Sequence, residues 1–227
     1  MKMINYIIIF MLAITCSQTQ IVTRGKCPMK KVMNNFNMTT YLGNWYEISK
    51  YPMIMESYGS CVKINYVKNS GSRIADMTIR MVDPVSNSIN TVSRKVKTQI
   101  DNGATLIISN KYGKNQFNYK ILATDYINWS LVWSCEEVTS YSNENLNETF
   151  TFEFAWIYSR QPTLSKRFLN RIQEILIENH LDPTKLVPTD QGMTECEIRS
   201  NYSGNSYVNF YTIFVCSALL FFVIYDV

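Results

Sequence analysis

Side chains of the kinds that perform catalysis are scarce in this chain, and the cysteines are the most informative of them. Six cysteines and a single histidine, His180, occur in 227 residues. No GxSxG, HExxH or glycine-rich phosphate loop is present, and no close group of cysteine and histidine has the spacing of a zinc site. His180 follows an expected helix, where a solvated or capping role is the plainer interpretation. We therefore expect no catalytic residue, no metal and no cofactor.

The beginning of the chain has the layout of a secretory precursor. Lys2 precedes an apolar run from Ile4 to Ala13, and small residues follow up to Ser17. This order is typical of a signal peptide, so we expect residues 1–17 to be removed, with Cys16 at or near the cleavage site. N-glycosylation sequons agree with export. They begin at Asn37, Asn128, Asn147 and Asn201.

The other end carries an apolar tail, residues 210–225, with no charge before Asp226. The tail is shorter than the roughly 20 residues that span a bilayer, and no Lys or Arg follows it. A small polar stretch precedes it, which is the pattern for attachment of a glycosylphosphatidylinositol lipid. We expect residues 201–227 to be this signal and the protein to lie at the outer face of the plasma membrane, or outside the cell. The candidate attachment residues are Asn201, Ser203, Gly204 and Asn205. The alternative is a short tail-anchor helix that stays in place.

Residues 18–200 remain as one expected domain. This part keeps Cys27, Cys61, Cys135 and Cys196, an even number in an exported domain, which indicates two disulfides with three pairings to choose from. The net charge of +4 is modest and the basic residues are scattered, so nucleic acid is not an expected partner.

Short segments with a period of two follow one another from Gly43 to about Tyr158. Val62, Ile64 and Tyr66, for example, alternate with polar residues, as in half-buried antiparallel strands. Eight strands are counted: one from Trp45, one around 62–66, and the others at 75–81, 89–96, 104–109, 117–124, 129–135 and 150–158. An amphipathic helical pattern follows from about 164 to 176. The order predicts an all-β fold, an eight-stranded antiparallel up-and-down barrel with one C-terminal α-helix packed on its side.

Three motifs occur in a specific order along this barrel. They are Tyr41-Leu-Gly-Asn-Trp-Tyr-Glu-Ile48, Thr124-Asp-Tyr126 and Arg160. Through them the chain resembles the lipocalin family. Through Lys26-Cys-Pro28, Phe154-Ala-Trp-Ile157 and Thr189-Asp-Gln191 it is most similar to the branch of apolipoprotein D and the insect Lazarillo proteins. The resemblance covers about residues 26–197 and implies the disulfide pairs Cys27–Cys135 and Cys61–Cys196.

The motif residues are interpreted as structural rather than as ligand contacts. Gly43 allows a close backbone approach and Trp45 plugs the narrow end of the barrel. The resemblance implies that Arg160 lies across this indole as a cation on an aromatic face. Thr124, Asp125 and Tyr126 are expected to close the same end.

Ligand contacts are expected from inward-facing side chains nearer the open end. Tyr66, Tyr119 and Trp156 match positions that line the pocket in the resembling branch, and Phe154, Ile64 and Ile121 share the apolar faces of their strands. Such a lining would take a lipid, sterol, retinoid or bilin. The alternative is that these side chains simply fill the barrel as its core.

Two loops at the expected mouth differ from plain solvent loops. Residues 49–60 are apolar, and we hypothesise that Met53, Ile54 and Met55 gate the pocket or touch a membrane. Residues 136–147 are polar and longer than in apolipoprotein D, so the identity of a ligand does not carry over from the resemblance.

The expected function is an extracellular binding protein, not an enzyme, that transports, stores or scavenges a small hydrophobic molecule. The alternative is a cell-surface recognition or adhesion glycoprotein of the Lazarillo kind, active in neuronal guidance. It would contact a cell-surface protein partner, and ligand binding would be secondary.

Overall fold

The computed structural model describes residues 20–53, 59–68, 74–83, 86–99, 103–110, 112–114, 116–140, 148–192 and 196. The signal-peptide and lipid-anchor predictions, the sequons at Asn147 and Asn201, and Ile54 and Met55 of the loop hypothesis lie outside these residues. The strands are β1 (Ile21–Arg24), β2 (Gly43–Lys50), β3 (Ser60–Lys68), β4 (Ile74–Val82), β5 (Ile89–Thr98), β6 (Thr105–Ser109), β7 (Phe117–Thr124), β8 (Trp129–Ser140), β9 (Glu148–Ser159) and β10 (Val187–Pro188). The helices are α2 (Met38–Tyr41), α3 (Lys166–Glu178) and the 3-10 turn η1 (Pro183–Lys185).

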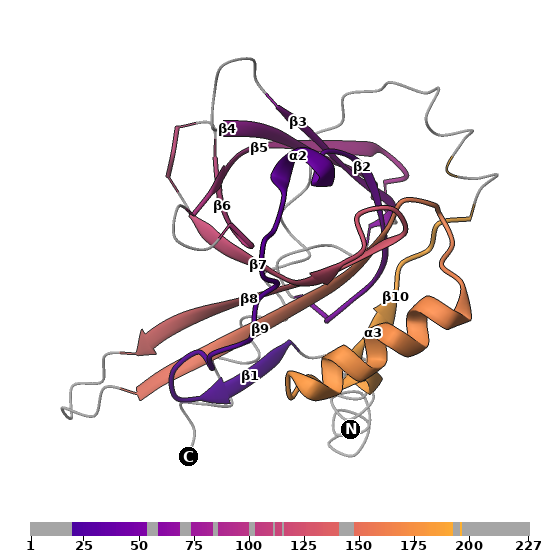
Figure 1. Cartoon of the computed structure of the whole chain (residues 1–227). Helices are drawn as coiled ribbons and strands as arrows, with labels where there is room; N and C mark the ends of the chain where they lie inside the picture. The colour runs from indigo at the N-terminus through magenta and orange to yellow at the C-terminus, as the bar shows by residue number, and fades with distance from the viewer. Residues whose placement is uncertain are drawn as a thin grey trace, which may run out of the picture.

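Strands β2 to β9 form a closed antiparallel barrel. Each pairs with the next along the chain, and β9 returns to pair with β2, where Tyr158 lies opposite Glu47 and Trp156 opposite Lys50. Closure removes the free strand edges that an open sheet would expose. Figure 1 views the barrel nearly along its axis, with α2 inside the outline of the ring and α3 against the outside. The predicted eight-stranded barrel with one main helix is confirmed.

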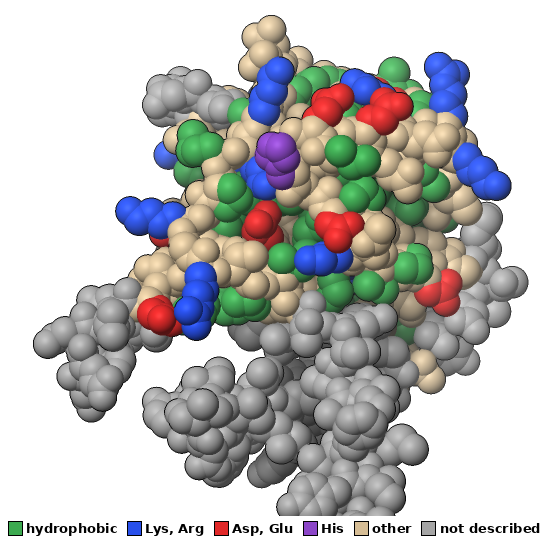
Figure 2. Space-filling view, turned by 90° about the horizontal axis from the view of Figure 1, so that it is seen from below, with side chains coloured by type: hydrophobic (Ala, Val, Ile, Leu, Met, Phe, Trp, Pro, Cys, Tyr) green, Lys and Arg blue, Asp and Glu red, His purple; other side chains and the backbone are tan. Residues whose placement is uncertain are grey.

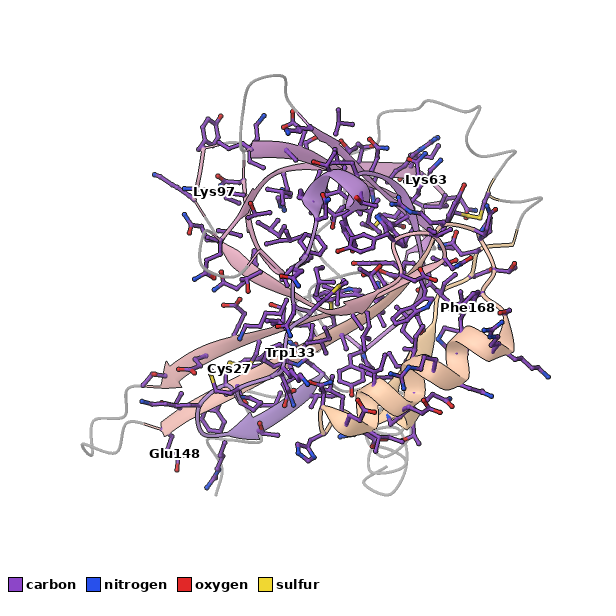
Figure 3. All side chains as sticks on the ribbon, in the orientation of Figure 1. Cys27, Lys63, Lys97, Trp133, Glu148 and Phe168 are labelled. Carbon is purple, nitrogen blue, oxygen red and sulfur yellow. A yellow bond between two sulfur atoms is a disulfide. The ribbon has the colours of Figure 1, made fainter. Side chains whose placement is uncertain are left out.

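Alternation along the strands divides the apolar side chains between two cores. One fills the barrel and contains Trp45, Met77 and Trp156. The other lies outside, where Trp133 of β8 packs with Ile172 and the rest of the apolar face of α3. Figure 3 labels Trp133 on β8 and Phe168 on α3, the two elements that meet in this outer core.

Two short strands, β1 and β10, were not predicted. β1 lies along β9, with Ile21 opposite Glu153 and Arg24 opposite Phe150. β10 contributes only Val187 and its neighbour to the edge of β2. Four and two residues are too short for a period of two to be recognised. The hairpin of β8 and β9 is also longer than predicted, because the two strands stay paired out to Ser140, beyond the ring in Figure 1.

The barrel wall between β2 and β3 is completed by a C-terminal segment, residues 187–191, which we call the strap. β2 pairs with β3 only from Gly43 to Tyr46. Beyond that point the strap binds both strands: Thr189 N donates to Ile48 O at 2.9 Å, and Cys61 N donates to Asp190 O at 2.7 Å. The Gln191 amide donates to Glu47 O and to Val62 O, each at 2.8 Å. The strap therefore holds together two strands that have parted.

Disulfides join Cys27 to Cys135 and Cys61 to Cys196, with sequence separations of 108 and 135 residues. These are the pairs that the resemblance implied. The first ties the N-terminal arm to β8, and the second ties the chain just after the strap to β3.

Candidate functional site

The closed end of the barrel is built around Trp45, whose side chain is fully buried. Its indole N–H donates to Tyr41 O at 2.9 Å, and the guanidinium carbon of Arg160 lies 3.7 Å from the ring centroid. Arg160 also donates hydrogen bonds to four backbone carbonyls. These belong to Thr40, Tyr41, Asn44 and Tyr126, at 3.2, 3.3, 2.8 and 2.9 Å. The Arg160 guanidinium thus donates to carbonyls of α2, of β2 and of the turn after β7, and it also covers the indole.

Gly43 is needed where β2 begins. Its φ is +94°, a backbone conformation open to glycine, and a Cβ there would lie 3.4 Å from Arg160 Nη1. A side chain at this position would be strained and would crowd the guanidinium.

Asp125 closes the turn between β7 and β8. Its carboxylate accepts hydrogen bonds from the backbone N–H groups of Ile127, Asn128 and Trp129 at 3.1, 2.7 and 3.0 Å. Thr124 Oγ1 donates to Trp129 O at 2.6 Å and accepts from Tyr126 N at 2.9 Å. The motif residues therefore lie together at the closed end, where their side chains bind backbone groups and have a structural role.

The pKa of Asp125 predicts how this end responds to acid. Burial raises the pKa, but the hydrogen bonds from Trp129, Asn128 and Ile127 outweigh it, and the pKa falls below its ordinary value. A group whose pKa is depressed by folding stabilises the protein above its unfolded pKa of about 4, and this stability is lost as pH falls through the folded pKa. We expect urea midpoints measured between about pH 7 and pH 2.5 to fall less steeply in Asp125→Asn than in the wild type. Parallel curves would contradict this role.

A small cavity of about 10 Å³ lies inside the barrel. This volume is about that of one water position. The lining residues are Glu47, Lys50, Val62, Ile64, Ile79, Met81, Tyr119, Trp156 and Tyr158. The walls are apolar and aromatic apart from one acid and one base.

The structure divides the expected ligand contacts into two groups. Ile64, Tyr119 and Trp156 line the cavity, and the rings of Tyr119 and Trp156 lie 4.8 Å apart. The ring of Phe154 stacks on that of Trp156, with 6.0 Å between the ring centroids. Phe154 lies two residues before Trp156 on β9, on the side of the β8–β9 hairpin.

Tyr66 and Ile121 lie elsewhere in the same interior core. Tyr66 pairs with Gly43 and its ring lies 5.5 Å from that of Tyr41, which places it at the closed end. Burial raises the pKa of the Tyr66 hydroxyl. Ile121 is fully buried, and Met33 of the N-terminal arm donates its N–H to Ile121 O.

Glu47 and Lys50 were missed as lining residues. They form an ion pair, with Lys50 Nζ 3.2 Å from Glu47 Oε1, and their side chains are 8% and 3% exposed for Lys50 and Glu47 respectively. Thr189 Oγ1 of the strap donates to the same carboxylate oxygen at 2.7 Å. Glu47 stands two residues after Trp45, so alternation could have placed it inside. Lys50 could not be placed this way, because the register shifts between Glu47 and Ser49.

A second hollow of about 210 Å³ lies between the strap and the ends of β2 and β3. It is lined by Lys50, Pro52, Gly59, Ser60 and residues 187–190. Lys50 thus borders both this outer hollow and the inner cavity. The strap lines the outer hollow, and Lys50 is the lining residue that the two hollows share.

Ser134 of β8 is buried, with 1% exposure, and its Oγ has no hydrogen-bond partner among the described residues. It lies two residues after Val132, which belongs to the interior core, and opposite Phe154. Its face of β8 is therefore the one toward the barrel interior. By contrast, the buried Ser130 lies 3.0 Å from the hydroxyl of Tyr41.

This difference between two serines gives a matched prediction. We expect Ser134→Ala to leave the free energy of unfolding unchanged or to raise it by up to about 1 kcal/mol, because an unpaired buried hydroxyl is costly. Ser130→Ala should lower it by about 1–2 kcal/mol, because the Tyr41 hydroxyl would lose its partner. Urea denaturation followed by tryptophan fluorescence measures both. Equal losses in the two variants would contradict the assignment.

The residues around the mouth and the sequons are only partly described. Met53, in the apolar loop after β2, packs against the interior core. Asn37 is exposed at the start of α2 and caps it through Oδ1, which accepts from Thr39 N. Asn128 is half-buried, and its side-chain amide donates to Asp125 at 2.7 Å. Of these two sequons, Asn37 is the more accessible.

Charges of both signs are mixed on the face of the molecule that Figure 2 shows, where Lys and Arg side chains lie among Asp and Glu side chains. In the described part of the chain no group of three or more His, Cys, Asp or Glu could hold a metal ion. No helix there is long and apolar enough to cross a bilayer.

A family model described as a lipocalin-like domain matches residues 36–191. The chain therefore belongs to the lipocalin family. Within it the chain is of the apolipoprotein D and Lazarillo type. It is 31% identical to apolipoprotein D of Bos taurus over 170 residues, which cover 74% of this chain and 83% of that protein. It is 29% identical to the Lazarillo protein of Schistocerca americana over 189 residues, or 82% and 83% of the two chains.

Solved structures agree on the fold. Insecticyanin from the tobacco hornworm Manduca sexta superimposes with a TM-score of 0.63 at 23% identity, covering 78% of this chain and 93% of that one. Lobster apocrustacyanin A1 gives a TM-score of 0.60 at 20% identity, with 76% and 92% covered. At these identities the likeness is one of fold.

Proposed function

We propose that this protein is a binding protein, not an enzyme, that holds one small hydrophobic molecule inside the barrel for transport, storage or scavenging. The observation that carries the proposal is the aromatic and aliphatic lining around Tyr119 and Trp156, in a barrel shut at its far end by Trp45 and Arg160. An eight-stranded barrel has room for one such ligand when its interior is not filled by side chains. Membership of the lipocalin family supports the same assignment.

Binding requires the interior to rearrange, because the cavity of about 10 Å³ is far smaller than a lipid or a retinoid. Methionine is the side chain best suited to this, being unbranched and polarisable. Met81 lines the cavity, and Met53 packs on the same core from the loop after β2. We infer that these side chains swing aside as a ligand enters and that this rearrangement lowers the apparent affinity.

A titration with retinol tests the proposal. Retinol absorbs where tryptophan emits, so binding beside Trp156 quenches protein fluorescence. We expect saturable quenching with one retinol per chain and a dissociation constant in the micromolar range or below. Quenching that rises linearly without saturation would reject the binding function.

We also propose export and a lipid anchor at the outer membrane face. The support is the sequence of residues 1–17 and 201–227. Treatment of intact expressing cells with a phosphatidylinositol-specific phospholipase should release the protein. Retention on the cells after treatment would instead favour a tail-anchor helix.

A second candidate function is recognition of a cell-surface protein. The β8–β9 hairpin favours it, because β8 continues past the end of the β7–β8 ladder at Trp133 and exposes Val138 to 51%, whereas β1 covers the edge of β9 from Phe150 to Glu153. Exposed strand edges pair readily with other chains. If this hairpin binds a partner, Val138→Lys should abolish binding of the soluble domain to cells, whereas Val67→Lys, at a similarly exposed position on β3, should not.

A further inference from the structure

The Glu47–Lys50 ion pair is the charged feature of an otherwise apolar lining. Both side chains are more than nine-tenths buried, and both border the inner cavity. The pair lies beside Trp156, since Lys50 is the β2 partner of that residue, and Tyr158 is the partner of Glu47. A polar group on a ligand held against Trp156 would meet these two side chains.

A buried ion pair is a costly way to stabilise this part of the fold. Removing two charges from water costs several kcal/mol for each ion, and apolar replacements of similar size are often as stable or more stable. The strap could pair with β2 through its backbone alone, as Thr189 N does with Ile48 O. An acid and a base at this place are therefore best explained by what they bind.

We propose that the Glu47–Lys50 pair recognises an uncharged oxygen, a hydroxyl or a ketone, on an apolar ligand, and that the barrel selects such ligands over carboxylic acids. The inference rests on the proposed function and specifies its ligand. A hydroxyl can accept a hydrogen bond from the ammonium and donate one to the carboxylate, so a single neutral group suits both partners.

The charges of the cavity lining disfavour a fatty acid as the ligand. Among the described lining residues, one positive and one negative side chain cancel. A ligand carboxylate would bring an uncompensated negative charge into an apolar space beside Glu47, and both burial and the like charge disfavour this. A neutral alcohol brings no such penalty.

The Ser134 hydroxyl is a further polar group in the barrel interior. Its hydroxyl has no hydrogen-bond partner among the described residues and lies on the interior face of β8, opposite Phe154. A buried hydroxyl without a hydrogen bond is unusual in a protein core, and an oxygen of a bound ligand would supply the missing hydrogen bond. The Glu47–Lys50 pair and the Ser134 hydroxyl together fit an apolar molecule with uncharged oxygens.

Retinol and retinoic acid test the proposal, since they share one hydrocarbon frame and differ in the terminal group. In tryptophan-quenching titrations at neutral pH, we expect the wild-type protein to bind retinol at least about tenfold more tightly than retinoic acid. Glu47→Gln leaves Lys50 as an uncompensated cation, so the preference should move toward retinoic acid by at least about tenfold. Glu174→Gln is the matched control, because Glu174 lies exposed on α3 and pairs with Arg171 far from the cavity. Its preference should equal that of the wild type.

The outcomes separate this inference from the proposed function. Equal binding of the two ligands, a wild-type preference for retinoic acid, or an unchanged preference in Glu47→Gln would overturn the inference and leave ligand binding standing. Saturable binding of neither ligand would overturn both. Should Glu47→Gln fail to fold, competition on the wild-type protein decides: hexadecan-1-ol should displace retinol at a concentration at least about tenfold lower than hexadecanoic acid. The reverse order would overturn the inference.

Discussion

Replacing Cys61 and Cys196 with serine is expected to lower the free energy of unfolding by about 3–5 kcal/mol. The bridge closes a loop with a sequence separation of 135 residues, so its loss frees many conformations in the unfolded chain. It also releases the chain end beyond the strap, which joins β2 to β3 where these strands do not pair with each other. Urea denaturation of the oxidised wild type and of the double variant measures the loss.

The matched control replaces Cys27 and Cys135, which have a separation of 108 residues. Loop length alone makes the two bridges differ by only about 0.2 kcal/mol. Both variants should therefore lose similar stability. Only the Cys61/Cys196 variant should also weaken retinol binding, because only this bridge anchors the strap beside Glu47 and Lys50. Equal effects of both variants on binding would show that the strap does not shape the site.

Arg160→Met is expected to lower the free energy of unfolding by about 3 kcal/mol. The substitution keeps an apolar stem over Trp45 but removes the cation and the donors to four backbone carbonyls. Arg160→Lys restores the charge without the planar fork, so it should recover less than half of the loss. Thermal and urea unfolding of both variants test this. A loss below about 1 kcal/mol for Arg160→Met would mean that other groups hold the closed end together.

The barrel could be predicted from the sequence because its strands are long enough to show alternation and are separated by good turn residues. The pattern at Val62, Ile64 and Tyr66, for example, became the interior face of β3. The strap could not be predicted this way. Residues 187–191 act through backbone hydrogen bonds, the Thr189 hydroxyl and the Gln191 amide, and none of these leaves a hydrophobic period in the sequence.

The candidate site was predicted in part, for a related reason. Alternation gives the face of a strand but not its height in the barrel, so Tyr66 was grouped with Tyr119 and Trp156 although it packs at the closed end. The acid and base were missed because charged residues are expected outside a barrel core. A register shift after Glu47 also turns Lys50 toward the cavity, and that shift depends on pairing with β9.

A ligand held inside the barrel against Trp156 can be detected with a long-chain alcohol carrying bromine atoms, which quench tryptophan on contact. Trp156 faces the interior and Trp133 packs outside it under α3, so Trp156→Phe and Trp133→Phe form a matched pair. We expect saturable quenching that Trp156→Phe largely abolishes and Trp133→Phe retains. Quenching that survives in Trp156→Phe and disappears in Trp133→Phe would place the ligand outside the barrel and contradict binding in its interior.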